Sequence, residues 1–162
     1  MTKAQEQKLE DFVIYTDIVT TELEEKAFKE AGIQLEYNTI NGLERYFQYI
    51  QWVIENYTKA DITQHVRVDL GIYYGELFTN IFGGYWTFLS KKGDPWEGIA
   101  IVEGFTNTKR AAQYVLNIIY RVLDEGNITA LKNAVRSATE YSIKFKSASA
   151  EDKKRITELV KI

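Results

Sequence analysis

Four polar side chains on one predicted helix form the arrangement in this sequence that could do chemistry. His65, Asp69, Glu76 and Asn80 follow one another at steps of four, seven and four residues, so they share one face of a helix. One imidazole with two carboxylates could hold a divalent metal, and Asp69 could orient His65 as an acid–base pair. Helix faces also align polar residues simply to meet water. We therefore predict no catalytic residue and no metal site, and keep His65 and Asp69 as candidates for binding.

The segment before Glu76 removes side chains from one strip of the same helix. Gly71 and Gly75 lie four residues apart, and each costs about 1 kcal/mol of helix propensity relative to alanine. Close approach of another backbone would offset that cost. A carboxylate beside this bare surface would be partly buried and would need a partner. We favour a structural role, in which Glu76 accepts a hydrogen bond from the backbone of a hairpin or from a tryptophan indole.

Aromatic side chains near Glu76 support a second interpretation, a binding site. Tyr73 and Tyr74 precede Glu76 on the helix, and Trp86 and Trp96 belong to the hairpin expected after it. Aromatic walls with a few converging polar groups are typical of small-molecule sites, and tyrosine and tryptophan are common anchors of protein interfaces. The candidate binding residues are Glu76, Tyr73, Tyr74, Trp86, Trp96, Asp69 and His65.

The composition excludes several classes of site. The sequence has no cysteine and a single histidine, which rules out cysteine nucleophiles, cysteine–zinc sites and two-histidine metal sites. The serines lack the Gly-x-Ser-x-Gly context of hydrolases, and the glycines follow no phosphate-loop pattern. We therefore expect no cofactor.

The net charge of −3 is unevenly distributed along the chain. Residues 127–162 carry eight Lys/Arg and four Asp/Glu, whereas residues 1–126 carry twelve and nineteen. The acidic body favours a basic protein partner through charge steering. The basic end lacks a stripe interleaved with aromatics, so we expect no nucleic-acid binding. The N-terminal residues do not resemble a signal peptide, and the apolar runs are shorter than a membrane span, so we expect a cytoplasmic protein that stays out of membranes.

Periodic apolar positions predict six helices and one short hairpin in a single domain, residues 1–162. The hairpin is expected over 85–90 and 96–102, and because two strands are marginal alone it must lie against the helices. The predicted fold class is α+β, mainly α, with about six helices packed around the hairpin. The first helix is expected to end at Gly32, the second to start at Asn41 and the third to run from Asp61 to Gly83. The fourth is expected to end at Gly126, the fifth to include Ile128–Ala138 and the sixth to start after Ser149.

Three short segments with spaced glycine and tryptophan follow one another between residues 62 and 105. They are Leu70-Gly71-Ile72-Tyr73-Tyr74-Gly75-Glu76, Gly83-Gly84-Tyr85-Trp86 and Gly93-Asp94-Pro95-Trp96. This pattern resembles small bacterial domains of unknown function, in which a helix reading L-G-x-Y-x-G-E leads into G-G-x-W and a short hairpin. Some domains of this type look like neighbours or partners of secreted toxins. The resemblance supplies no activity to carry over to this chain, and it shifts the expectation slightly towards an intracellular immunity function.

Three hypotheses about function follow. The first is a non-enzymatic protein-binding module, such as an immunity or partner-neutralising protein, because the catalytic inventory is poor and anchor residues are abundant. The alternative is a small-molecule-binding protein or enzyme with an aromatic-walled pocket around Glu76, Asp69 and His65. The third is a homo-oligomeric helical scaffold, in which the aromatic second helix packs a flank against another copy. The residues that make its flanks apolar are Tyr46, Tyr49, Trp52 and Val53.

Overall fold

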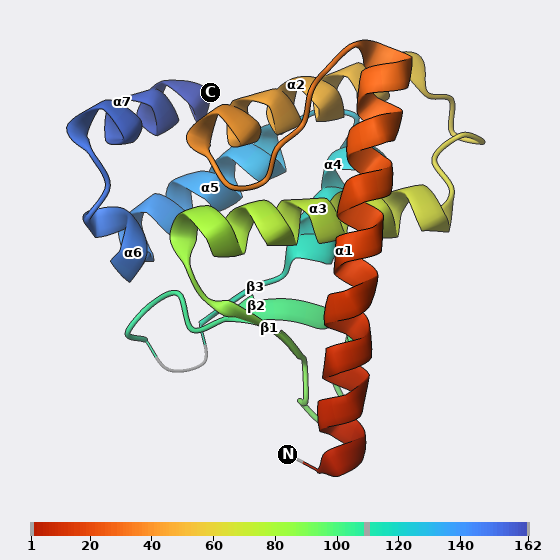
Figure 1. Ribbon diagram of the computed structural model, residues 1–162, viewed down its shortest axis with the longest axis vertical. Helices are drawn as coiled ribbons and strands as arrows, with labels where there is room; N and C mark the ends of the chain where they lie inside the picture. The colour runs from red at the N-terminus through yellow and green to blue at the C-terminus, as the bar shows by residue number, and fades with distance from the viewer. Residues whose placement is uncertain (1, 109–110, 162) are drawn as a thin grey trace.

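Seven helices and a three-stranded antiparallel sheet make up the structure, a computed structural model that describes residues 2–108 and 111–161 (Figure 1). The class is α+β and mainly α, as predicted. The elements are α1 (Lys3–Ala31), α2 (Ile40–Asn56), α3 (Gln64–Phe82), β1 (Tyr85–Phe88), β2 (Ala100–Glu103), β3 (Ala112–Gln113), α4 (Val115–Glu125), α5 (Thr129–Tyr141), α6 (Ile143–Lys146) and α7 (Ala150–Leu159).

Helix α3 lies at the centre, with α1 crossing one side, α4 on the other and the sheet below (Figure 1). The close packing of α3 on α4 depends on Gly71. A Cβ at this position would lie only 3.1 Å from the Cα of Leu116 on α4, and it would overlap the side chain of that leucine. The predicted close approach of another backbone is therefore present, and it offsets the low helix propensity of glycine.

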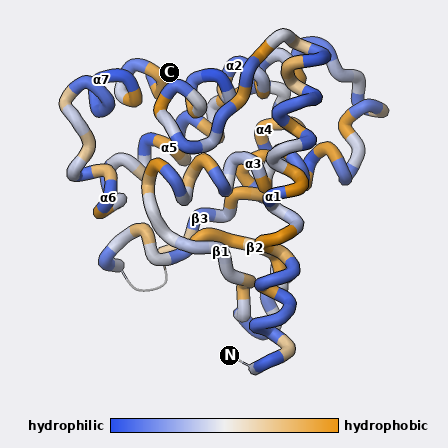
Figure 2. Tube along the Cα trace, in the orientation of Figure 1, coloured by the Kyte–Doolittle hydropathy of each residue, from blue (hydrophilic) through white to orange (hydrophobic). Residues whose placement is uncertain are grey.

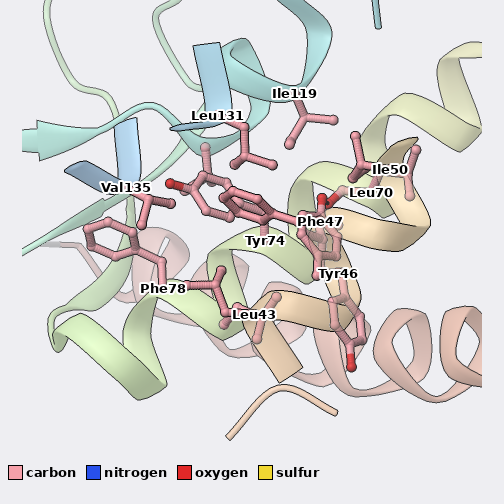
Figure 3. Packing of buried hydrophobic residues seen from close by; sticks show 14 of the residues in the cluster. Leu43, Tyr46, Phe47, Ile50, Leu70, Tyr74, Phe78, Ile119, Leu131 and Val135 are labelled. Carbon is pink, nitrogen blue, oxygen red and sulfur yellow. Dashed lines mark hydrogen bonds between the residues drawn. The ribbon is translucent and has the colours of Figure 1, made fainter. Parts of the chain in front are cut away.

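Stacked tyrosines join α2 to α3 in the core (Figure 3). The ring of Tyr46 stacks on Tyr73 and Tyr74, with centroids 5.7 and 6.2 Å apart, and its hydroxyl donates a hydrogen bond of 2.6 Å to the carbonyl of Leu70. Of the four flank residues of the scaffold hypothesis, Tyr46, Tyr49 and Val53 are buried within the chain, whereas Trp52 is partly exposed. Most of that flank of α2 is therefore not a free surface.

The sheet has the order β1-β2-β3, with Trp86 of β1 opposite Val102 of β2. The two-residue β3 pairs with the end of β2. It is too short to carry the alternating pattern from which a strand is predicted. The sheet therefore extends the predicted hairpin by one strand.

The connection between β1 and β2 is longer than predicted, and Trp96 lies in it. The Asp94 carboxylate accepts a 2.8 Å hydrogen bond from the backbone N–H of Trp96, which starts a turn. Gly98, with φ of +85°, then bends the chain so that its N–H donates to the carbonyl of Leu89 at 2.7 Å. As a result β2 begins at Ala100, and the predicted strand over 96–102 was wrong in its first four residues.

The ends of the long helices agree with prediction at three glycines and differ at two starts. Gly32, Gly83 and Gly126 are the C-caps of α1, α3 and α4. Helix α2 starts after Thr39 and α3 after Thr63, because each hydroxyl accepts a backbone N–H of the first turn. Asn41 and Asp61 were the predicted starts. The side chain of Asp61 instead closes a turn with Thr58.

Hydrophobic residues follow one another along β2, whereas α7 is mostly hydrophilic (Figure 2). Within the described ranges, every helix is too short or too polar to cross a membrane.

Candidate functional site

Glu76 joins α3 to the sheet through Trp86. The indole N–H of Trp86 donates to Oε1 of Glu76 at 3.0 Å, and the indole ring fills the space that a Cβ on Gly75 would need. Phe12 of α1 packs edge-on against the same ring, with centroids 5.1 Å apart. The structural interpretation of Glu76, as the acceptor for a tryptophan indole, is thus confirmed.

Asn80, at the end of the predicted polar face, also takes part in packing. Its side-chain amide donates to the carbonyl of Glu76 at 2.8 Å, and its own carbonyl accepts the Nζ of Lys144 on α6 at 2.6 Å. The C-terminal half of the polar face, formed by Glu76 and Asn80, therefore fixes α3 to β1 and α6.

His65 and Asp69 form an ion pair at the other end of α3, with Nε2 and Oδ2 3.2 Å apart. The His65 side chain is 73% exposed, whereas that of Asp69 is 16% exposed. The pKa of Asp69 is raised above its ordinary value, and burial is the main cause. The charge of Glu22 also raises this pKa, whereas the charges of His65 and Lys26 lower it. The second oxygen of Asp69, Oδ1, is buried and accepts no hydrogen bond from the described residues.

These polar side chains do not converge on one concave site. Glu76 lies eleven positions after His65, which is about 16 Å along a helix, and each of the two is already paired with a different residue. Among the residues with described positions, no group of three or more His, Cys, Asp or Glu could hold a metal ion. The pocket hypothesis required convergence of these groups, and the geometry does not provide it.

The predicted aromatic residues are divided between the core and the surface. Tyr73, Tyr74 and Trp86 are buried, whereas Trp96 is 48% exposed in the turn before β2. The Tyr73 hydroxyl donates to Glu24 of α1 at 2.9 Å. Burial, followed by the charge of Glu24 and this hydrogen bond, raises the pKa of Tyr73 far above its ordinary value. The three buried rings hold helices together and leave only Trp96 open to a partner.

An open groove of about 970 Å³ lies elsewhere, between α2 and α7. We call it the α2/α7 groove. Its apolar floor comes from both walls and from the residues that precede α2 and α5. Five apolar lining residues are buried or half-buried, and we call them the floor: Ile33, Phe47, Trp52, Ile128 and Leu159. We call the polar lining residues of the two helices the rims: Glu44, Gln48, Gln51 and Glu55 on α2, and Glu151, Lys154, Arg155 and Glu158 on α7. Lys132 of α5 also lines the groove.

Ion pairs and main-chain contacts fix the position of the α7 wall. Arg155 of α7 donates through Nε to Glu44 of α2 at 3.0 Å, and its Nη2 lies 3.0 Å from the other oxygen of Glu44. Lys132 of α5 donates to the carbonyl of Lys161, just after α7, at 2.7 Å. Ile156, which is buried, anchors the inner side of α7. The two walls are therefore held at a defined spacing.

Trp52 is a rigid part of the α2 wall. Its ring stacks on Tyr49 at a centroid distance of 6.0 Å and meets Tyr57 edge-on at 5.8 Å. The Tyr57 hydroxyl donates to Glu30 at 2.7 Å, and burial raises the pKa of Tyr49 to about 12. A half-buried tryptophan held on both sides presents a fixed apolar surface to the groove.

Sequence reasoning did not find this groove. Phe47 follows the spacing of apolar residues along α2 that is typical of core positions, and α7 carries charged residues that resemble an ordinary solvated face. The available signal is Trp52, an apolar residue outside a stripe that is already complete.

Comparisons with known proteins add no relative. A scan against protein-family models, a search of curated proteins and a search of solved structures each found no match. The resemblance to small bacterial domains therefore stays a prediction.

Proposed function

We propose that this protein is a polypeptide-binding module that takes a helical segment of its partner into the α2/α7 groove. The observation that carries the proposal is the groove itself, an apolar floor between two helical walls with charged residues along both rims. Amphipathic helices bind in grooves of this kind by laying their apolar face on the floor. The predicted protein-binding function would then use the α2/α7 groove, and not Tyr73 and Tyr74, which are buried.

The dimensions of the groove suit a short helix. From Glu44 to Glu55 the α2 wall rises about 16 Å, or about three turns. A three-turn helix with side chains is about 10–12 Å wide and occupies on the order of 1,500 Å³. A groove of about 970 Å³ is therefore of a size to seat one face of such a helix and leave its polar face in water.

The rims favour a partner helix with both signs of charge. On α2, Glu55 accepts a hydrogen bond from Gln51, and on α7 the neighbouring residues Glu151 and Lys154 are both exposed. Charges of both signs at the edge of an apolar floor set the register and direction of a bound helix more than its affinity. We expect Trp52 to supply most of the binding energy, since buried aromatic anchors dominate such interfaces.

Site-specific photo-crosslinking in cells of the native host tests the proposal. A benzoylphenylalanine at Gln48, on the α2 rim, should crosslink to an amphipathic helical segment of one partner, identified by mass spectrometry. The same group at Lys91, in the exposed loop after β1, serves as the matched control.

Leu159→Glu, which puts a charge on the groove floor without changing α2, should abolish the Gln48 crosslink in a folded protein. Identical crosslinks from Gln48 and Lys91, or a Gln48 crosslink that persists in folded Leu159→Glu, would contradict the proposal.

A further inference from the structure

Helix α1 exposes large apolar side chains on its outer face. Ile14 is 62% exposed, Ile18 51% and Phe28 63%. At 3.6 residues per turn these three lie within about 80° of the helix circumference, so they share one face, on which Thr21 and Glu25 stand between Ile18 and Phe28. We call this row of three apolar side chains the stripe. The opposite face packs on the body through Thr16 and Leu23, among others. Exposed apolar stripes of this kind mark interaction surfaces more often than isolated apolar residues do.

Acidic residues border the stripe over its central turns. Between Lys8 and Lys26 the chain has no lysine or arginine. The same stretch contains five exposed acids that flank Ile14 and Ile18. They are Glu10, Asp11, Asp17, Glu22 and Glu25. We call this surface, with Ile14, Ile18 and Phe28, the acidic α1 face.

The charges of the acidic α1 face disfavour a second copy of the chain as its occupant. An antiparallel pair of α1 helices centred between Ile14 and Ile18 places Glu10 of one copy opposite Glu22 of the other. A parallel pair places each acid beside its own equivalent. Like charges at an interface cost free energy in either arrangement, and no lysine or arginine lies between Lys8 and Lys26 to compensate for them.

We infer that the acidic α1 face is the docking surface for a polypeptide that presents an apolar ridge bordered by lysine or arginine. The apolar stripe supplies the area that association buries, and the border of acids selects a basic partner. This surface is formed by α1 alone and shares no residue with the α2/α7 groove, so the inference stands independently of the proposed function.

Selection from a library of displayed helical peptides tests the inference with the intact protein. Every peptide carries a fixed apolar stripe, and the positions beside the stripe are randomised among Lys, Glu, Gln and Ser. Binding to the wild type is selected, and binding to Ile14→Ser/Ile18→Ser is counter-selected. Both isoleucines are exposed, so this double variant should fold, as checked by circular dichroism and thermal melting.

We expect clones that bind the wild type at least tenfold more tightly than the double variant and that are enriched in Lys over Glu beside the stripe. Their affinity should fall as salt is added, because exposed charges are screened. Glu10→Gln/Glu22→Gln should weaken them as well, whereas Leu159→Glu in the groove should not. A loss of binding in Leu159→Glu would by itself place the binding in the groove and overturn the inference.

Three other outcomes also overturn it. The first is that no clone distinguishes the wild type from the double variant. The second is that clones dependent on Ile14 and Ile18 contain as much Glu as Lys beside the stripe. The third is a wild-type dimer in sedimentation equilibrium that Ile14→Ser/Ile18→Ser dissociates, because the occupant would then be a second copy.

Discussion

The indole of Trp86 donates its N–H to the Glu76 carboxylate while its ring covers the bare backbone of Gly75. Two neighbouring residues of α3 thus receive one side chain of β1, the first by a hydrogen bond and the second by close packing. This contact joins the central helix to the sheet. It explains why a glycine and a glutamate stand side by side in the middle of a helix.

Removal of the acceptor should destabilise the protein, whereas its replacement by an amide should not. Glu76→Ala leaves the buried indole N–H without a partner, which costs about 1–3 kcal/mol in the free energy of unfolding. Glu76→Gln keeps a carbonyl acceptor and should lose much less. Urea denaturation of the two variants beside the wild type measures both. Equal stability of the two variants would show that the hydrogen bond contributes little.

Gly71→Ala should destabilise the protein despite its gain of about 1 kcal/mol in helix propensity. The added Cβ meets Leu116 of α4, and overpacking of a close-packed contact typically costs about 1–3 kcal/mol. The midpoint of urea denaturation should fall. Combining the change with Leu116→Ala should recover part of the overlap cost, so the double variant should be more stable than the sum of the two single effects implies. Simple additivity would argue against direct contact.

Two stacked tyrosines should respond differently to loss of the hydroxyl. Tyr46→Phe removes a buried hydrogen bond to Leu70 and should cost about 0.5–1.5 kcal/mol. The Tyr74 hydroxyl is buried and has no hydrogen-bond partner among the described residues, so Tyr74→Phe should be neutral or stabilising. Thermal melting of the two variants provides the comparison. A larger loss of stability in Tyr74→Phe than in Tyr46→Phe would contradict the assignment of the hydrogen bond to the Tyr46 hydroxyl.

Asp69 should make the protein more stable as the pH falls. Burial raises its pKa in the folded state above the ordinary value of 3.8, so the folded protein binds a proton more tightly than the unfolded chain does. The Asp69 carboxylate therefore lowers the free energy of unfolding at neutral pH. This loss of stability is relieved as the pH falls through the pKa of Asp69 in the folded state to below 3.8.

Asp69→Asn should melt at a higher temperature than the wild type at pH 7, and the difference should shrink on acidification. His65→Ala removes the partner that lowers the pKa of Asp69, so it should enlarge the penalty at pH values where His65 is protonated. Melting temperatures measured across this pH range check both expectations. A difference that is independent of pH would contradict the role of the carboxylate.

Trp52 and Trp96 offer a matched test of the groove. Trp52→Ala should weaken binding of the segment identified by crosslinking by roughly tenfold or more, the effect expected of an aromatic anchor. Trp96→Ala, in the turn before β2, should leave the affinity unchanged. Titration calorimetry with the synthetic segment measures both. Equal losses would move the binding surface away from the groove.

The parts of the fold that could be predicted are those where local rules agree with packing. Gly32, Gly83 and Gly126 end helices as predicted, because a change of backbone direction there favours glycine over other residues. The starts of α2 and α3 were misplaced by two residues, because several residues near each start can cap a helix. Tertiary context selects among them, and in α3 the competing Asp61 closes a turn instead.

The contacts of Glu76 could be predicted, and the binding surfaces could not. A glutamate beside a glycine in a helix signals a specific neighbour, and a tryptophan follows ten residues later. The α2/α7 groove instead depends on where α7 packs, which is set by Arg155 reaching Glu44 across 111 residues of sequence. Periodicity within single helices holds no information about such pairs.

The α7 wall of the groove contributes little to the core, since Ile156 is the only buried residue within its bounds, whereas α2 contributes seven. The two walls therefore differ in local stability. The amides of α7 are expected to open to hydrogen exchange through small local fluctuations, and those of α2 only through unfolding of much larger parts of the molecule. A ligand that contacts both walls would couple the opening of α7 to the opening of α2. Binding in the groove would therefore be measured as slower hydrogen exchange of the α7 amides.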